Sequence, residues 1–118
     1  MYLMVIITKE EEKTLEFLRL LVTIGVKGAT VVDGRGMGSL LQEKETYFTS
    51  IEQVLTAQID LTENRLILSV IHSGEILAEA RKLAHKVFGD FSKADTGVLF
   101  VLPVMDAEGV GGAKPPKA

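Results

Sequence analysis

The chain has 118 residues, 47% of them hydrophobic and 25% charged, with a net charge of −3 and no cysteine. This length accommodates one domain, and the apolar content excludes a disordered chain. Without cysteine there is no disulfide, thiol nucleophile or thiolate metal site, and an acidic balance with no basic run argues against nucleic-acid binding. No segment is long enough to cross a bilayer, and the N-terminal apolar run is too short for a signal peptide, so we expect a cytoplasmic protein without membrane insertion.

The N-terminal part of the chain predicts a strand, a helix and a second strand. Residues 2–8 form a continuous apolar run, as in a buried strand. Thr8 and Glu11 have the spacing of a capping box, and Gly25 is a typical helix stop, so we expect a helix between them. A shorter strand is expected at residues 29–33. The apolar stripe of the helix is predicted to contain Leu15, Leu18, Leu21, Val22 and Ile24.

Three glycines at alternate positions follow the second predicted strand: Gly34, Gly36 and Gly38. Glycine adopts positive φ without strain, and its missing Cβ lets a ligand approach the backbone N–H groups. The pattern indicates either an anion or nucleotide site or a simple turn that shapes the end of the strand.

The second half repeats the order of strand, helix and strand. We expect strands at residues 66–71 and 97–104. Ser73 or His72 is predicted to cap the helix between them, and Gly89 to end it. The apolar stripe of this helix is predicted to contain Ile76, Leu77, Ala80, Leu83, Ala84, Val87 and Phe88. The end of the chain from residue 109 is rich in glycine and proline, which predicts disorder.

This order predicts an α+β fold: a ferredoxin-like βαββαβ sandwich, with an antiparallel sheet and two helices on one face. The strands are apolar on both faces, so the face away from the helices must also be covered. No further element is available in the chain, so we expect other subunits to cover it in a closed symmetric assembly. Pro103 fits an edge strand, where a missing N–H is tolerated.

A long segment separates the second and third predicted strands. It runs over residues 39–65, far beyond the ~2–5 residues of an ordinary hairpin loop. Such a length indicates a functional or disordered loop. We therefore divide the chain into a domain at 1–104 that contains this loop and a flexible tail at 105–118.

These features together resemble the P-II nitrogen-regulatory signal-transduction family. Residues 24–31 (Ile-Gly-Val-Lys-Gly-Ala-Thr-Val) match the end of the family's first helix and its second strand. This alignment places Gly36-Met-Gly38 on the family's Gly-Phe-Gly, and residues 39–65 on its partner-binding T-loop. Residues 95–101 (Asp-Thr-Gly-Val-Leu-Phe-Val) resemble the B-loop that meets nucleotide phosphates.

The resemblance implies a homotrimeric regulator that is not an enzyme and needs no metal or fixed cofactor. It implies an adenine nucleotide as effector, bound in clefts between subunits, and a protein target bound through the loop 39–65. The implied target-binding residues are Glu45, Tyr47 and Phe48. The implied nucleotide-binding residues are Thr30, Gly36, Met37, Gly38, Val70, Thr96 and Gly97.

The chain departs from the family where phosphates are bound. The B-loop lysine is Val98 here, its first glycine is Asp95, and the arginines after the last strand are absent. Each lost charge-assisted hydrogen bond removes about 1.5–3 kcal/mol. We therefore expect AMP, ADP or a cyclic nucleotide to bind at least as well as ATP, or nucleotide binding to be lost. The tyrosine motif that is modified in the family is not reproduced around Tyr47.

Two alternatives have the same order of elements. A CutA-like trimer related to divalent cations often ends in a strand similar to residues 99–104 (Leu-Phe-Val-Leu-Pro-Val). It lacks the combination of Gly-Met-Gly and a long loop. A small ferredoxin-like enzyme would need a polar cavity between helices and sheet, and we find no catalytic set by motif.

Overall fold

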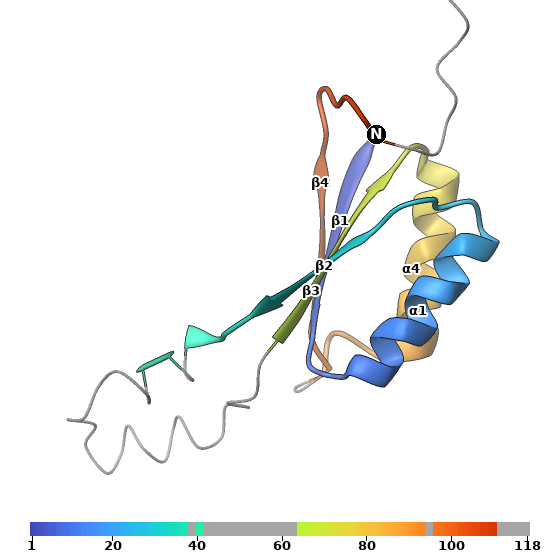
Figure 1. The fold of residues 1–118 in the computed structure, drawn as a ribbon. Helices are drawn as coiled ribbons and strands as arrows, with labels where there is room; N and C mark the ends of the chain where they lie inside the picture. Colours follow the sequence, from blue (N-terminus) through green and yellow to red (C-terminus); the bar gives the residue numbers. More distant parts are fainter. Residues whose placement is uncertain (38–39, 42–63, 94–95, 111–118) are drawn as a thin grey trace, which may run out of the picture.

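The computed structural model describes residues 1–37, 40–41, 64–93 and 96–110. In chain order the elements are β1 (Tyr2–Thr8), α1 (Glu11–Thr23), β2 (Thr30–Gly34), β3 (Asn64–Ile71), α4 (Gly74–Phe88) and β4 (Val98–Pro103). The strands form one antiparallel sheet in the order β2-β3-β1-β4. Both helices cover the same face of this sheet (Figure 1). The predicted ferredoxin-like βαββαβ fold is confirmed, and Pro103 lies on an edge strand.

The core lies between the sheet and the helices. Side chains of β1 and β3 that point to the helices alternate with those that point away, as the pleat requires. Phe17 of α1 and Phe88 of α4 meet with ring centroids 5.3 Å apart, and Ala80 and Ala84 let the helices pack closely. The buried apolar core consists of Met4, Ile6, Phe17, Leu21, Val26, Ile67, Ile71, Ala80, Ala84, Val87 and Phe88.

The caps of α4 agree with the sequence, and the N-cap of α1 does not. The Ser73 hydroxyl accepts a hydrogen bond from the Ile76 N–H at 3.2 Å, and Gly89 ends α4 with φ +100°. The predicted capping box at Thr8 is wrong, because Glu10 is the N-cap of α1 and no side chain caps it. Thr8 instead belongs to β1, where it pairs with Arg65.

The predicted stripe of α1 is also partly wrong. The buried side of α1 carries Thr14, Phe17 and Leu21, whereas Leu15 and Val22 point outward. Thr14 is tolerated in the core because its hydroxyl donates to the Glu10 carbonyl oxygen at 2.8 Å.

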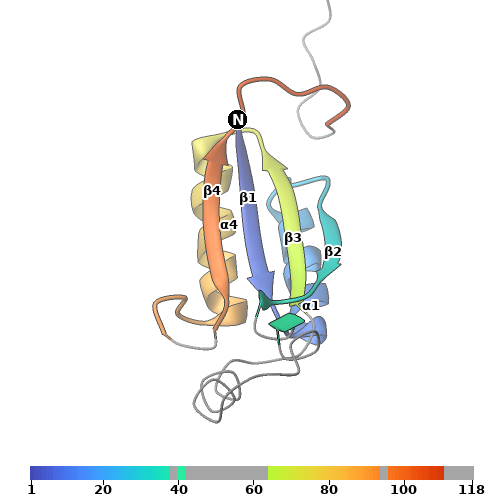
Figure 2. The same ribbon diagram turned by 90° about the vertical axis from the view of Figure 1, so that its left-hand side faces the viewer.

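The face of the sheet away from the helices is open (Figure 2). Val98, Phe100 and Leu102 of β4 are 50%, 41% and 45% exposed. By strand register, this outer face carries Leu3, Val5, Ile7, Thr30, Val32, Asn64, Leu66, Leu68, Val70, Val98, Phe100 and Leu102. Thr30 and Asn64, at opposite ends of the sheet, are the polar side chains of this set, so most of the outer face is apolar, as the sequence predicted. A surface of this kind marks an interaction site.

Candidate functional site

The predicted nucleotide-binding residues fall at two ends of the open face. We call the end where β1 begins the upper end and the end where β1 finishes the lower end, as they lie in Figures 1 and 2. Thr30 and Val70 line the upper pocket, Gly97 lines the lower pocket, and Gly36 lies beside Asn64 at the edge of the lower pocket. Within one chain these residues therefore lie at two separate pockets.

The upper pocket has a volume of about 260 Å³. Thr30 starts β2, and the Ser69 hydroxyl donates to the Gly28 carbonyl oxygen at 3.0 Å, which fixes the chain just before that strand. Beyond β4 the Val104 N–H donates to the Met1 carbonyl oxygen at 3.0 Å, and the chain then reaches this pocket with Gly109 and Val110. The lining residues are Gly28, Ala29, Thr30, Leu68, Val70, Gly109 and Val110. Residues 109 and 110 of the predicted tail therefore lie against the domain.

The lower pocket has a volume of about 230 Å³ and joins the ends of three strands. Ile7 and Lys9 lie at the end of β1, Asn64 starts β3, and Gly97 and Val98 lie at the start of β4. The lower pocket combines the ammonium group of Lys9, the amide side chain of Asn64 and the backbone of Gly97, which no side chain covers. Such a set can bind a small anion.

Gly97 has a backbone reason to be glycine. Its φ is +128°, and a Cβ added there would lie 2.5 Å from the Ile7 carbonyl oxygen. Thr96, the other predicted B-loop residue, is half-buried. Its methyl group would lie 3.9 Å from a Cβ added at Gly89. The strand β4 can therefore start beside β1 only with glycine at position 97.

Gly34 and Gly36 are required for a reason other than the predicted positive φ. Positive φ is not the reason for Gly34 or Gly36, since neither adopts it. An added Cβ at Gly34 would lie 2.9 Å from Leu66 Cδ1, and one at Gly36 would lie 3.3 Å from Asn64 Nδ2. The close approach is thus to the chain's own side chains.

Met37 lies next to Gly36, beyond the end of β2. Met37 is 74% exposed, and the Leu40 N–H donates to the Gly36 carbonyl oxygen at 3.0 Å. Gly38, Glu45, Tyr47, Phe48 and Asp95 lie outside the described residues, as does most of the predicted loop. The last two positions assigned to that loop, 64 and 65, belong to β3.

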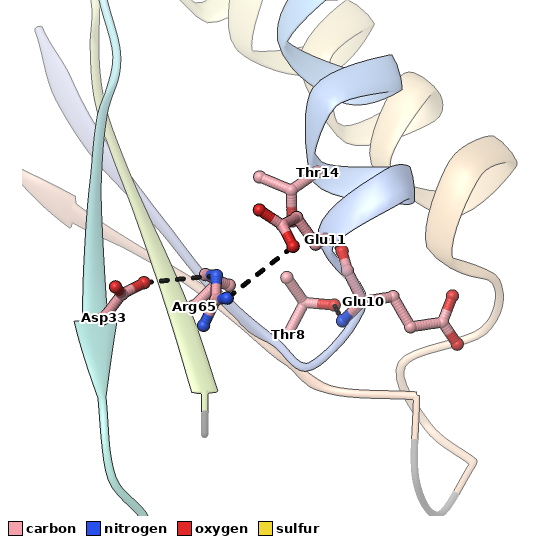
Figure 3. A network of polar contacts seen from close by, with 6 residues as sticks. All are labelled: Thr8, Glu10, Glu11, Thr14, Asp33 and Arg65. Carbon is pink, nitrogen blue, oxygen red and sulfur yellow. Dashed lines mark hydrogen bonds and ion pairs between the residues drawn. The ribbon is translucent and has the colours of Figure 1, made fainter. Parts of the chain in front are cut away.

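An arginine joins the two ends of the long loop to α1. Arg65 Nε lies 3.2 Å from Asp33 Oδ1, and Arg65 Nη2 lies 4.0 Å from Glu11 Oε2 (Figure 3). Asp33 and Arg65 are also partners in the β2–β3 ladder. Because the arginine is mostly buried and both carboxylates are exposed, the pairs contribute little stability, about 0–1 kcal/mol each. The two ion pairs connect β2, β3 and the start of α1 at the lower end of the sheet.

The turn that leads from α4 toward β4 contains a carboxylate held by local hydrogen bonds. The Ser92 hydroxyl and the Ser92 N–H both donate to Asp90 Oδ1, at 2.7 and 2.9 Å. These hydrogen bonds, the hydroxyl first, lower the pKa of Asp90 below its ordinary value. Within the described part of the chain, no group of three His, Asp or Glu side chains could hold a metal ion.

Comparison with known proteins decides between the related fold families. Residues 1–113 match the family described as Nitrogen regulatory protein P-II. The chain belongs to this family. It is therefore a P-II signalling protein, a regulator rather than an enzyme. A search of curated proteins finds no match.

Solved structures show the same fold at low sequence identity. The GlnK–ATP complex of B. subtilis is 19% identical, with a TM-score of 0.53 over 86% of this chain and 78% of that one. GlnK of B. subtilis is 17% identical, with a TM-score of 0.52 over 88% and 84%. CutA1 from Pyrococcus horikoshii is 11% identical, with a TM-score of 0.56 over 92% and 88%. The P-II and CutA folds thus resemble this chain equally well, and the family match favours P-II.

Sequence reasoning missed several residues that line the two pockets. Lys9 lay inside the predicted capping box and Asn64 inside the predicted loop, neither as a binding residue, and Gly109 and Val110 were assigned to a disordered tail. Lys9 and Asn64 meet through strand pairing across the sheet, and Gly109 and Val110 reach the upper pocket through a turn after β4; a single sequence has no local signal for either arrangement. In the described residues, neither helix is long and apolar enough to be a membrane span.

Proposed function

We propose that this P-II protein is a homotrimer that binds an adenine nucleotide between subunits and regulates a protein partner. The observation that supports this most is the division of the predicted site between two ends of one open apolar face. A ligand that contacts both halves is accommodated when the upper pocket of one subunit faces the lower pocket of its neighbour. Threefold closure repeats this contact three times and covers the outer face of each sheet.

The apolar outer face supports the assembly part of the proposal. Burial of apolar surface contributes about 25 cal/mol per Å². The three exposed side chains of β4, Val98, Phe100 and Leu102, lie beside those of β1 and extend the apolar surface to the edge of the sheet. Light scattering of the purified chain should therefore give the mass of three 12.8 kDa subunits.

The proposed effector is an adenine nucleotide with few phosphates. One of the related structures is a GlnK–ATP complex, which supports an adenine nucleotide as the ligand class. At the start of β4, however, Val98 offers no charge to a phosphate chain. We propose that AMP, ADP or a cyclic nucleotide binds at least as well as ATP, and that ATP affinity rises on Val98→Lys.

The partner would be a protein that contacts residues 39–65, with Glu45, Tyr47 and Phe48 as contact residues. The Arg65 ion pairs support this, because they connect the base of the loop to the lower end of the sheet and to α1. In this proposal, a ligand in the lower pocket changes the affinity of the protein for its partner. By family, the expected location is the cytoplasm.

Mixing two inactive variants tests the shared site. Thr30→Phe fills the upper pocket and Gly36→Leu crowds Asn64 at the edge of the lower one, so each homotrimer should lose adenine nucleotide binding by calorimetry. After the two variants are unfolded and refolded together, random assembly should restore about one site in four, because an intact upper half then meets an intact lower half of another subunit. The absence of any restored binding in verified mixed trimers would contradict a shared site.

A further inference from the structure

The lower pocket contains a positively charged residue, Lys9, close to the start of β4. Ile7 pairs with Val98 in the β1–β4 ladder, and Lys9 follows two positions after Ile7, just beyond the end of β1. Lys9 is half-buried and lines the pocket together with Asn64 and Gly97. The pocket therefore combines a lysine with an amide side chain.

The two carboxylates that directly follow Lys9 in the sequence, Glu10 and Glu11, have other partners. Glu10 Oε2 lies 3.0 Å from Lys13 Nζ on the exposed side of α1. Glu11 and Asp33 both face Arg65. Lys9 itself already interacts within the chain, so a bound anion would add to or replace that interaction.

We infer that Lys9, with Asn64 beside it, binds a single phosphate-sized anionic group of the effector in the lower pocket. An ammonium group donates up to three hydrogen bonds, and the Asn64 amide adds two more donors. Gly36 allows this amide to lie against the loop, since an added Cβ would be 3.3 Å from Asn64 Nδ2. One lysine and one amide suit one phosphate and leave further phosphates without a cation.

This inference rests on the proposed function, because the lower pocket is one half of the proposed nucleotide site. It assigns the specificity for a phosphate to Lys9, which lies outside the residues singled out by sequence. The same chemistry would also bind free inorganic phosphate, so the test includes that anion separately.

The test compares adenosine with AMP by calorimetry at constant ionic strength. The unsubstituted protein should bind AMP about 10- to 100-fold more tightly than adenosine, which corresponds to about one charge-assisted hydrogen bond. Lys9→Met keeps much of the length of the side chain and removes its charge, so it should abolish this difference and leave adenosine binding unchanged. Asn64→Asp should also reduce AMP binding, because a carboxylate would face the phosphate.

Lys13→Met is the matched control, since Lys13 is an exposed lysine of α1 that pairs with Glu10. It should keep the preference for AMP. Equal binding of AMP and adenosine by the unsubstituted protein, or an AMP preference that survives Lys9→Met, would overturn the inference.

Inorganic phosphate distinguishes this inference from the proposed function. If adenosine and AMP both fail to bind, the proposed nucleotide site is wrong. The Lys9 assignment would still stand if phosphate shifts the amide resonances of Asn64 and Gly97 in the unsubstituted protein and not in Lys9→Met. If phosphate shifts neither resonance, the Lys9 assignment is wrong as well.

Discussion

Replacement of Gly97 by alanine tests whether the start of β4 sets the shape of the lower pocket. At φ +128° an L-residue is strained, which costs about 1–3 kcal/mol. The added Cβ would also lie 2.5 Å from the Ile7 carbonyl oxygen, closer than real Cβ contacts allow. Ile7 pairs with Val98 on one side and Leu66 on the other, so its carbonyl cannot move without disturbing the centre of the sheet.

We expect Gly97→Ala to lower the free energy of unfolding by about 2–4 kcal/mol. For a domain of this size each kcal/mol lowers Tm by about 3–6 °C, so calorimetry should show a Tm at least about 6 °C lower. Protein concentration must be held constant, because the Tm of an oligomer depends on it.

Gly28→Ala is the control for the glycine substitution itself. Gly28 does not have positive φ, and an added Cβ would meet no heavy atom within 4 Å. The Tm of the Gly28→Ala protein should remain unchanged or rise slightly, because alanine lowers the conformational entropy of the unfolded chain. A Gly97→Ala protein as stable as Gly28→Ala would refute the reasoning about the start of β4.

Three further predictions concern binding, pH and the core. Gly36→Ala should leave Tm within about 3 °C, because the Cβ meets only the end of a side chain, yet should weaken adenine nucleotide binding in calorimetry. Ser92→Ala should raise the pKa of Asp90 toward its ordinary value in an NMR titration. The stability that comes from the lowered pKa is present at pH values above the pKa of Asp90 in the unfolded chain, and it is lost as the pH falls through the pKa in the folded protein. The variant should therefore lose less stability in acid than the unsubstituted protein. Phe17→Ala should cost about 3–5 kcal/mol in denaturant unfolding, and Val22→Ala, on the same helix but 70% exposed, less than about 0.5 kcal/mol. Equal losses of stability for Phe17→Ala and Val22→Ala would contradict the assignment of Phe17 to the buried side of α1.

Local signals in the sequence predicted the elements well. Gly25 and Gly89 end the helices with positive φ, and Ser73 caps α4, because each depends only on neighbouring residues. Thr8 failed as a cap because pairing with Arg65 keeps it in β1, and this tertiary constraint overrides the local preference.

The site could be predicted only in part. Gly36 and Gly97 were found by resemblance to a motif, and both line or adjoin the lower pocket. Lys9 was not found, because it reaches this pocket through the register of β1 with β4, which brings together residues about 90 positions apart. The side of α1 that is buried was also ambiguous, since leucines occur on both sides and Phe17 interrupts the expected stripe.

The pairing of Asp33 with Arg65 has a consequence for how this protein can evolve. The segment between them leaves and rejoins the sheet at adjacent positions, because Gly34 pairs with Asn64 next to that pair. The entropic cost of closing a loop rises by only about 0.6 kcal/mol for each doubling of its length. The segment can therefore be lengthened, shortened or exchanged with little effect on the folded domain. New partners can be acquired by insertion in this region, while the sheet and its pockets remain unchanged.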